Sequence, residues 1–164
     1  MRFGVVATGT ESVLITRSGG THDNRSDMVE TLSLALPGFA PPSGKRAFIN
    51  PNLLSRLPAL PAQVDERQSS VWLPQASLFA NTVRLHLPLG FRTETLPTAV
   101  QFATAYGTYV SQYLALPDGT VQYIRRLELK RGQLPRTAYA GDLDFRRKVS
   151  IADKAQIVLL KTES

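Results

Sequence analysis

Few residues in this chain could serve as a nucleophile or as its base. The chain has no cysteine, which excludes disulfides, thiolate metal sites and a cysteine nucleophile. A serine nucleophile usually needs a histidine within hydrogen-bond reach, and the histidines are His22 and His86. His86 falls in the outward row of a predicted strand, and the G-x-S-x-G spacing of a hydrolase nucleophile turn is missing. The sequence therefore predicts no catalytic residue.

Acidic residues cluster in places where a structural role is sufficient. The segment THDNRSD, residues 21–27, lacks the ligand spacing of a calcium loop and is typical of a turn. Asp142 and Asp144 precede Arg146 and Lys148 by four residues each, as ion pairs near the start of a helix do. These patterns favour turns and caps over a metal site.

Hydrolysis by paired carboxylates and nucleotide binding find little support. Asp65 and Glu66 are adjacent, so on an extended chain they point to opposite faces and cannot flank one bond. Neither G-x-x-x-x-G-K-[ST] nor G-x-G-x-x-G occurs, so no loop that cradles phosphate is predicted. We expect no metal and no cofactor, while a stand-alone hydrolase with carboxylates from distant positions stays open as the less favoured alternative.

The segment YIRRLELKRGQLPR, residues 123–136, carries the strongest concentration of positive charge. The net charge is +6, which permits attraction to anionic partners. Arg125, Arg126, Lys130 and Arg131 form a candidate anion-binding surface for nucleic acid or acidic glycan. Lysine and arginine on an exposed strand also prevent aggregation, and no RNA-binding signature accompanies them. We favour a solvated strand face and expect no specific nucleic-acid partner.

Alternating apolar and polar residues predict the strands that position these groups. TVRLHLP, residues 82–88, turns Val83 and Leu85 one way and His86 the other. Two longer runs meet around Pro117, Asp118 and Gly119, which predicts a hairpin with a tight turn at residues 117–119. Along its second arm Val121, Tyr123, Leu127 and Leu129 share one face, and only Arg125 breaks the pattern.

The last part of the chain has helical spacing instead. Phe145, Val149 and Ala152 recur at helical intervals, with Thr137 as the expected cap, before a last strand AQIVLLK at residues 155–161. Nearer the start, residues 11–16 and 29–37 are predicted strands. The stretch FINPNLLSRLPALP, residues 48–61, is predicted to hold one helical turn with Asn50 as its cap and Pro51 at its first helical position.

These patterns together predict a mainly β fold. We expect an antiparallel, β-sandwich-like domain with one C-terminal helix followed by a last strand. Residues 29–164 are predicted to form a single β-rich domain, and residues 1–28 an N-terminal segment that either continues a preceding region or supplies the first strands. No run of about eighteen apolar residues predicts a membrane span, and the first residues do not have the pattern of a signal peptide.

Five spaced stretches resemble one known family. They are SGKRAFINPNLLSR, DERQSSVWLP, LPLGFRTETLP, RRLELKRGQLPRTAY and IADKAQIVLLK, in this order. In this combination the chain resembles, over residues 29–161, the C-terminal domain of unknown function that follows a transglutaminase-like core in exported bacterial proteins.

The resemblance implies that the chain accompanies an enzyme and does not itself catalyse the reaction. The cores of that family carry a Cys-His-Asp set, and no member of it can be transferred to a chain without cysteine. The leading hypothesis is thus a non-catalytic accessory or interaction domain with a transglutaminase-like core as its partner, and a periplasmic or cell-envelope setting. The resemblance also implies turns at Asn50, Pro51 and Gly90, a charged pair at Glu66 and Arg67, and Tyr139 at the helix start. The oligomeric state stays open.

Overall fold

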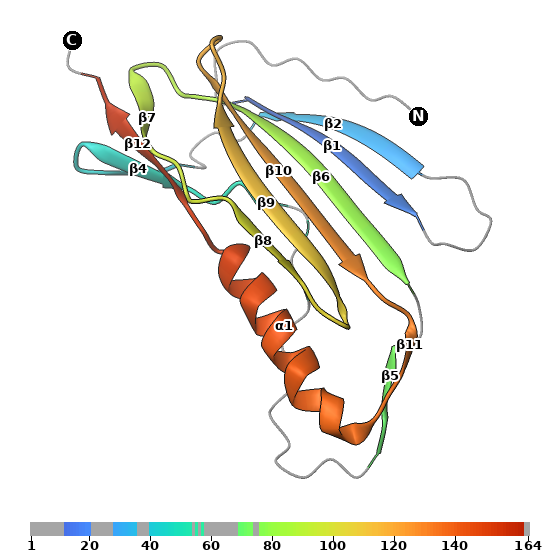
Figure 1. Cartoon of the computed structure of the whole chain (residues 1–164). Helices are drawn as coiled ribbons and strands as arrows, with labels where there is room; N and C mark the ends of the chain where they lie inside the picture. Colours follow the sequence, from blue (N-terminus) through green and yellow to red (C-terminus); the bar gives the residue numbers. More distant parts are fainter. Residues whose placement is uncertain are drawn as a thin grey trace.

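The structure is a computed structural model that describes residues 12–20, 28–35, 40–53, 55, 57, 69–73 and 76–162. Three antiparallel sheets make up this part of the chain (Figure 1). The largest has the strand order β2-β1-β6-β10-β9-β8. Its strands are, in chain order, β1 (Ser12–Gly20), β2 (Met28–Ala35), β6 (Ser77–His86), β8 (Val100–Ala103), β9 (Gly107–Ala115) and β10 (Thr120–Leu129).

Two smaller sheets, a 3-10 turn and one α-helix make up the rest of the described residues' regular structure. The second sheet has the order β3-β4-β12-β7, with β3 (Pro42–Ser43), β4 (Arg46–Ile49), β7 (Phe91–Thr95) and β12 (Ile157–Lys161). The third pairs β11 (Gly132–Leu134) with β5 (Val71–Leu73). A 3-10 turn, η1 (Arg136–Ala138), leads into the helix α1 (Tyr139–Ala152). The predicted fold class, mainly antiparallel β with one late helix and a last strand, is confirmed.

The predicted hairpin joins β9 to β10. Gly119 has a φ of 79°, which suits glycine, and its N–H donates to the carbonyl of Leu116 at 3.1 Å. The carboxylate of Asp118 accepts from both the N–H and the hydroxyl of Thr120, at 3.0 and 2.6 Å. This Asx-type turn fixes the register in which Tyr123 faces Tyr113 across the strand pair.

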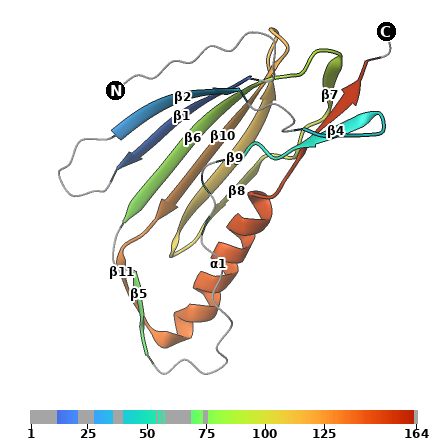
Figure 2. The ribbon, with the colours of Figure 1, turned by 180° about the vertical axis from the view of Figure 1, so that it is seen from behind.

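The described elements that cover the large sheet all lie on one face of it. The four-stranded sheet packs on one end, where Ile49 and Ile157 join Val83, Val121 and their neighbours in one apolar cluster. The helix packs on the other end of the same face, where Phe145 and Val149 meet Tyr109 and Leu127. Figures 1 and 2 show both layers on the same side of the sheet. We call this covered side the inner face and the opposite side the outer face.

The helix confirms its predicted spacing and corrects its predicted cap. Phe145 and Val149 are buried, and Ala152 packs partly buried beside them. Thr137 lies inside the 3-10 turn, and the N-cap position belongs to Ala138, which makes no side-chain cap bond. In the 3-10 turn the N–H groups of Ala138 and Tyr139 donate to the backbone carbonyls of Pro135 and Arg136, so backbone groups and not the threonine side chain satisfy them.

Residues 50–53 correct a second expectation, the helical turn predicted to start at Asn50 and Pro51; residues 54, 56 and 58–61 of that stretch lie outside the described residues. The described residues there form a turn in which the side-chain oxygen of Asn50 accepts from the N–H of Asn52 at 2.9 Å, and the N–H of Leu53 donates to Pro51. No helical turn is present among them. Asn50 forms an Asx turn, in which its side chain accepts a backbone N–H two residues later. An asparagine can form this turn instead of capping a helix.

The remaining expectations about strands and turns are confirmed where the structure describes the residues. β1 and β2 confirm strands at residues 11–16 and 29–37 in type, and β1 lies between β2 and β6 inside the large sheet. Gly90 has a φ of 79° in the turn before β7, and Tyr139 begins α1. Residues 21–27, with His22, and residues 65–67 lie outside the described residues. No helix in the part described is long and apolar enough to cross a membrane.

Candidate functional site

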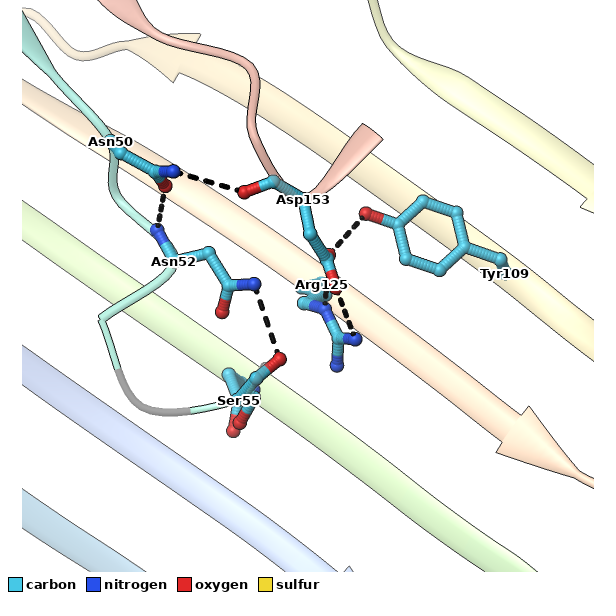
Figure 3. A network of polar contacts seen from close by, with 7 residues as sticks. Asn50, Asn52, Ser55, Tyr109, Arg125 and Asp153 are labelled. Carbon is cyan, nitrogen blue, oxygen red and sulfur yellow. Dashed lines mark hydrogen bonds and ion pairs between the residues drawn. The ribbon is translucent and has the colours of Figure 1, made fainter. Parts of the chain in front are cut away.

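A buried ion pair joins the middle of the large sheet to the end of the helix. Arg125 lies on the inner face of β10, 1% exposed, in the row that also contains Tyr123 and Leu127. Its Nε and Nη2 atoms donate to the two carboxylate oxygens of Asp153 at 2.7 and 2.9 Å (Figure 3). Asp153 is the C-cap residue of α1, and its N–H donates to the carbonyl of Val149. The bidentate geometry therefore fixes where the helix ends on the sheet.

Further polar contacts extend from this pair. The hydroxyl of Tyr109 on β9 donates to Asp153 at 2.8 Å, and the Nδ2 of Asn50 donates to the backbone carbonyl of Asp153 at 3.1 Å. The guanidinium carbon of Arg125 lies 5.5 Å from the centre of the Tyr109 ring. The cation is thus held by a carboxylate at its edge and by an aromatic ring at its face.

A second short chain of contacts reaches β6. Asn52, whose N–H binds Asn50, donates through Nδ2 to the carbonyl of Ser55 at 3.2 Å. The Nδ2 of Asn81 on β6 donates to the Ser55 hydroxyl at 2.6 Å. The network therefore connects the loop after β4, the strands β6, β9 and β10, and the end of α1 (Figure 3).

Burial shifts the titration of the groups in this region. Burial alone would lower the pKa of Arg125, but its hydrogen bonds to Asp153 outweigh this and raise the pKa above its ordinary value. Burial raises the pKa of Tyr109 and Tyr123 well above the ordinary 10.0 of tyrosine. The next cause is the charge of Asp153 at Tyr109, and at Tyr123 it is the neighbouring Tyr109, followed by Asp153. Burial raises the pKa of Tyr113 to about 12. All three tyrosines are neutral at physiological pH.

Comparison with known proteins places most of this architecture in one family. The family DUF3858, described as a domain of unknown function with a solved structure, matches residues 45–159. The chain belongs to the DUF3858 family. No curated protein and no solved structure matches the chain. The matched residues include Arg125, Asp153 and Tyr109, whereas β1 and β2 lie before them. The expectation of a domain of unknown function is confirmed, and its tie to transglutaminase-like proteins stays a prediction.

Of the four residues of the predicted basic surface in this DUF3858 domain, the structure buries one and exposes three. Arg125 is buried and bound to Asp153, so it cannot contribute to a surface. Arg126, Lys130 and Arg131 are exposed. Arg126 reaches Glu128 at 4.0 Å, and the Nζ of Lys130 donates to the carbonyl of Thr104 at 3.2 Å. Anion binding by the three exposed residues stays a prediction.

The carboxylates whose side chains are described each contact a basic or hydroxyl group. Asp142 pairs with Arg146 and Asp144 with Lys148, both at 2.9 Å, which confirms the predicted helical pairs. The other contacts are Arg46 with Glu94, Thr120 with Asp118, Arg126 with Glu128, and Arg125 with Asp153. Within the described ranges no group of three or more potential metal ligands occurs. The carboxylates there serve as partners for nearby residues.

Sequence reasoning missed Asp153, Tyr109 and Asn81 as parts of one network. The strand pattern did indicate that Arg125 is buried, because alternate residues on a strand share a face and Arg125 alternates with Val121, Tyr123 and Leu127. A charged residue in an inward row requires a buried partner of opposite charge. Which acid supplies it depends on where the helix ends over the sheet, and the strand pattern does not contain that information.

Proposed function

We propose that this chain is a non-catalytic accessory domain that binds a transglutaminase-like protein through the outer face of its large sheet. The partner class rests on the resemblance of five spaced stretches to the domain that follows a transglutaminase-like core. The surface rests on one observation: the helix and the four-stranded sheet both cover the inner face, and no described element covers the outer one.

The outer face has an apolar centre. Ile124 on β10 is flanked diagonally by Val110 and Leu114 on β9, because Gln112 is its direct partner in the register. Leu114 is 45% exposed. An antiparallel sheet that faces water usually carries polar residues on that side, so three neighbouring aliphatic side chains are not required by folding.

A polar and basic rim surrounds this centre. Arg126 lies next to Val110, and Arg84 on β6 lies opposite Gln122. An apolar centre with a polar rim is the usual composition of a protein interface. Glu128 lies on the same face and offsets the charge of Arg126, so Arg84 leaves the rim with a net positive charge. The surface therefore suits a partner whose own contact face has aliphatic residues bordered by acidic ones.

The binding test uses the transglutaminase-like protein encoded in frame with this chain or beside it in the same genome. We expect that purified protein to form a complex with this domain in titration calorimetry. Leu114→Glu and Arg126→Glu should each weaken the complex at least tenfold, since they place charge in the apolar centre or reverse the rim. The matched control is Ile151→Glu, at a 65% exposed position on α1, which should bind like the wild type.

Two results would contradict the proposal. One is the absence of any transglutaminase-like reading frame in the genome, or of a complex with its product. The other is equal weakening by Ile151→Glu, which would place the contact away from the outer face. Circular dichroism and the urea midpoint of each variant confirm that the fold is intact.

Anion binding is the second candidate, favoured by the exposure of Arg126, Lys130 and Arg131 where β10 ends. It predicts binding to heparin or DNA at low salt that falls steeply as salt is added, because phosphate or sulfate contacts release counterions. Replacing the three with alanine should abolish this binding, whereas Lys45, Arg147 and Lys154, which are also exposed, serve as the matched triple control. No binding at low salt would exclude this candidate.

A further inference from the structure

Four buried side-chain atoms on the inner face have no hydrogen-bond partner in the described structure. They are Asn81 Oδ1, Ser111 Oγ, Tyr123 Oη and Arg125 Nη1. The Ser111 hydroxyl also lies near the hydroxyls of Tyr109 and Tyr113, and this contact partly offsets the rise in pKa that burial gives both tyrosines, but its geometry is not that of a hydrogen bond. Asn81 is 5% exposed and the other three residues are 1% exposed. Buried polar groups in folded proteins are nearly always hydrogen-bonded, and a buried donor or acceptor left without a partner is strongly unfavourable. A partner must therefore meet these atoms.

The strand register brings the four residues together, and we call them the inner polar cluster. Arg125 on β10 is the direct partner of Asn81 on β6 and of Ser111 on β9. Directly paired residues have Cβ atoms about 4.5–5.5 Å apart. Tyr123 lies two residues before Arg125 on the same face, about 7 Å along the strand. One small molecule can therefore reach several of these atoms at once.

The direction of the arginine supports this reading. Nε and Nη2 of Arg125 are both used by Asp153, and Figure 3 shows the remaining nitrogen pointing away from that carboxylate. Asn81 likewise donates from Nδ2 to Ser55, and its side-chain carbonyl oxygen has no hydrogen-bond partner in the described structure. A donor on β10 and an acceptor on β6 thus remain in one row of the sheet.

The chemistry of the cluster selects its ligand. Arg125 can only donate, the carbonyl oxygen of Asn81 can only accept, and the hydroxyls of Ser111 and Tyr123 can do either. The positive charge of Arg125 is already balanced by Asp153 at 2.7 Å. An anion would meet the carbonyl oxygen of Asn81 and the nearby carboxylate, and a cation would meet the guanidinium. The ligand must be small, uncharged, and both donor and acceptor.

We propose that the inner polar cluster holds an ordered internal water that bridges Arg125 Nη1 to Asn81 Oδ1, with the hydroxyl of Ser111 or Tyr123 as its third partner. Buried waters typically make about three hydrogen bonds to otherwise unsatisfied groups, and this cluster offers that number. The water links β6, β9 and β10 through side chains, in addition to their backbone ladder. This inference does not depend on the proposed partner.

A crystal structure of the wild-type chain grown in sodium bromide tests the identity of the ligand. We expect electron density for water within hydrogen-bond distance of Arg125 Nη1 and Asn81 Oδ1, and no anomalous peak there. A bromide peak, a side chain of this chain in that place, or a dry cluster with no density would each overturn the proposal.

Two substitutions at one position test it in solution. Ser111→Ala leaves space for the water, whereas the larger Ser111→Val displaces it and leaves Arg125 Nη1 without a partner. We expect Ser111→Val to have the lower urea midpoint of the two, although valine favours strands. Thr82→Val on the outer face of β6 is the control for strand propensity and should show no such loss. If the cluster is dry, valine fills space and removes an unpaired hydroxyl, so Ser111→Val at or above Ser111→Ala would overturn the proposal.

Discussion

Arg125 and Arg126 are consecutive in sequence and lie on opposite faces of the same strand. The side chain of Arg125 is 1% exposed and that of Arg126 is 55% exposed. On the inner face the arginine makes a bidentate pair with Asp153 at 2.7 and 2.9 Å, and on the outer face the arginine lies 4.0 Å from Glu128. Which face of the strand a basic residue lies on, and not how many charges surround it in the sequence, decides whether it is buried in an ion pair or exposed to solvent.

The two faces also differ in how strongly a partner is needed. A buried cation without its counterion loses hydration and gains nothing in return, so breaking a buried pair is strongly unfavourable. An exposed pair is solvated and screened by salt, and its loss is usually small. The same kind of substitution should therefore have very different effects on the two faces.

Asp153→Ala is expected to have the largest effect. It leaves Arg125 charged and buried, and it removes the acceptor for Tyr109. Loss of one partner of a buried pair typically costs about 3–5 kcal/mol of unfolding free energy. Asp144→Ala, which removes the exposed Asp144–Lys148 pair, should cost no more than about 0.5 kcal/mol. Urea unfolding of both variants measures the contrast, and equal losses would show that the buried pair is solvated.

Apolar residues should show the same contrast on a smaller scale. Leu127 is 1% exposed on the inner face, and Leu114 is 45% exposed on the outer face. Leu127→Ala leaves a cavity against Phe145 and Val149 and should lower the unfolding free energy by about 3 kcal/mol. Leu114→Ala should change it by about 0.5 kcal/mol or less. A large loss for Leu114→Ala would mean that the outer face is covered in the free protein.

Local patterns in the sequence were sufficient to predict the β9–β10 hairpin, the helix and the last strand. Alternation, the residues Pro117, Asp118 and Gly119, and the helical spacing of Phe145 and Val149 each report on a few neighbouring residues. Such patterns depend only on nearby residues, so they can be interpreted without knowledge of the rest of the fold. The confirmed hairpin, helix and last strand are all of this kind.

The buried network could not be predicted in the same way. Arg125 and Asp153 are 28 residues apart, and Tyr109 and Asp153 are 44 apart. Their meeting depends on how the helix crosses the sheet, which is set by packing of Phe145 and Val149 on Tyr109 and Leu127. The error at Thr137 has a similar origin, since the path of the chain from β11 decides how the helix begins.

High pH should weaken the inner face selectively. Tyrosine in the unfolded chain ionises with a pKa of 10.0, whereas burial raises the folded pKa of Tyr113 to about 12 and that of Tyr123 further. Above pH 10 the unfolded state releases protons that the folded state retains, so the unfolding free energy falls as pH rises. Urea midpoints should be flat just below pH 10 and decline above it. Tyr123→Phe should make this decline shallower, and an unchanged slope would show that Tyr123 ionises freely in the folded protein.

Only a small change in stability is expected when the whole buried pair is replaced at once. Arg125→Met with Asp153→Leu and Tyr109→Phe removes both charges and the hydroxyl that depends on them, and it keeps similar volume. Replacing a buried ion pair by apolar residues is often neutral or stabilising, because the desolvation of both charges is avoided. We expect the triple variant to lie within about 1 kcal/mol of the wild type, far above Asp153→Ala alone. If the triple variant instead loses as much unfolding free energy as Asp153→Ala, the ion pair with its Tyr109 contact contributes net stability to the wild type. If stability is retained but amide exchange in α1 accelerates, the ion pair serves to fix the position of the helix on the sheet, which no count of charges along the strand would reveal.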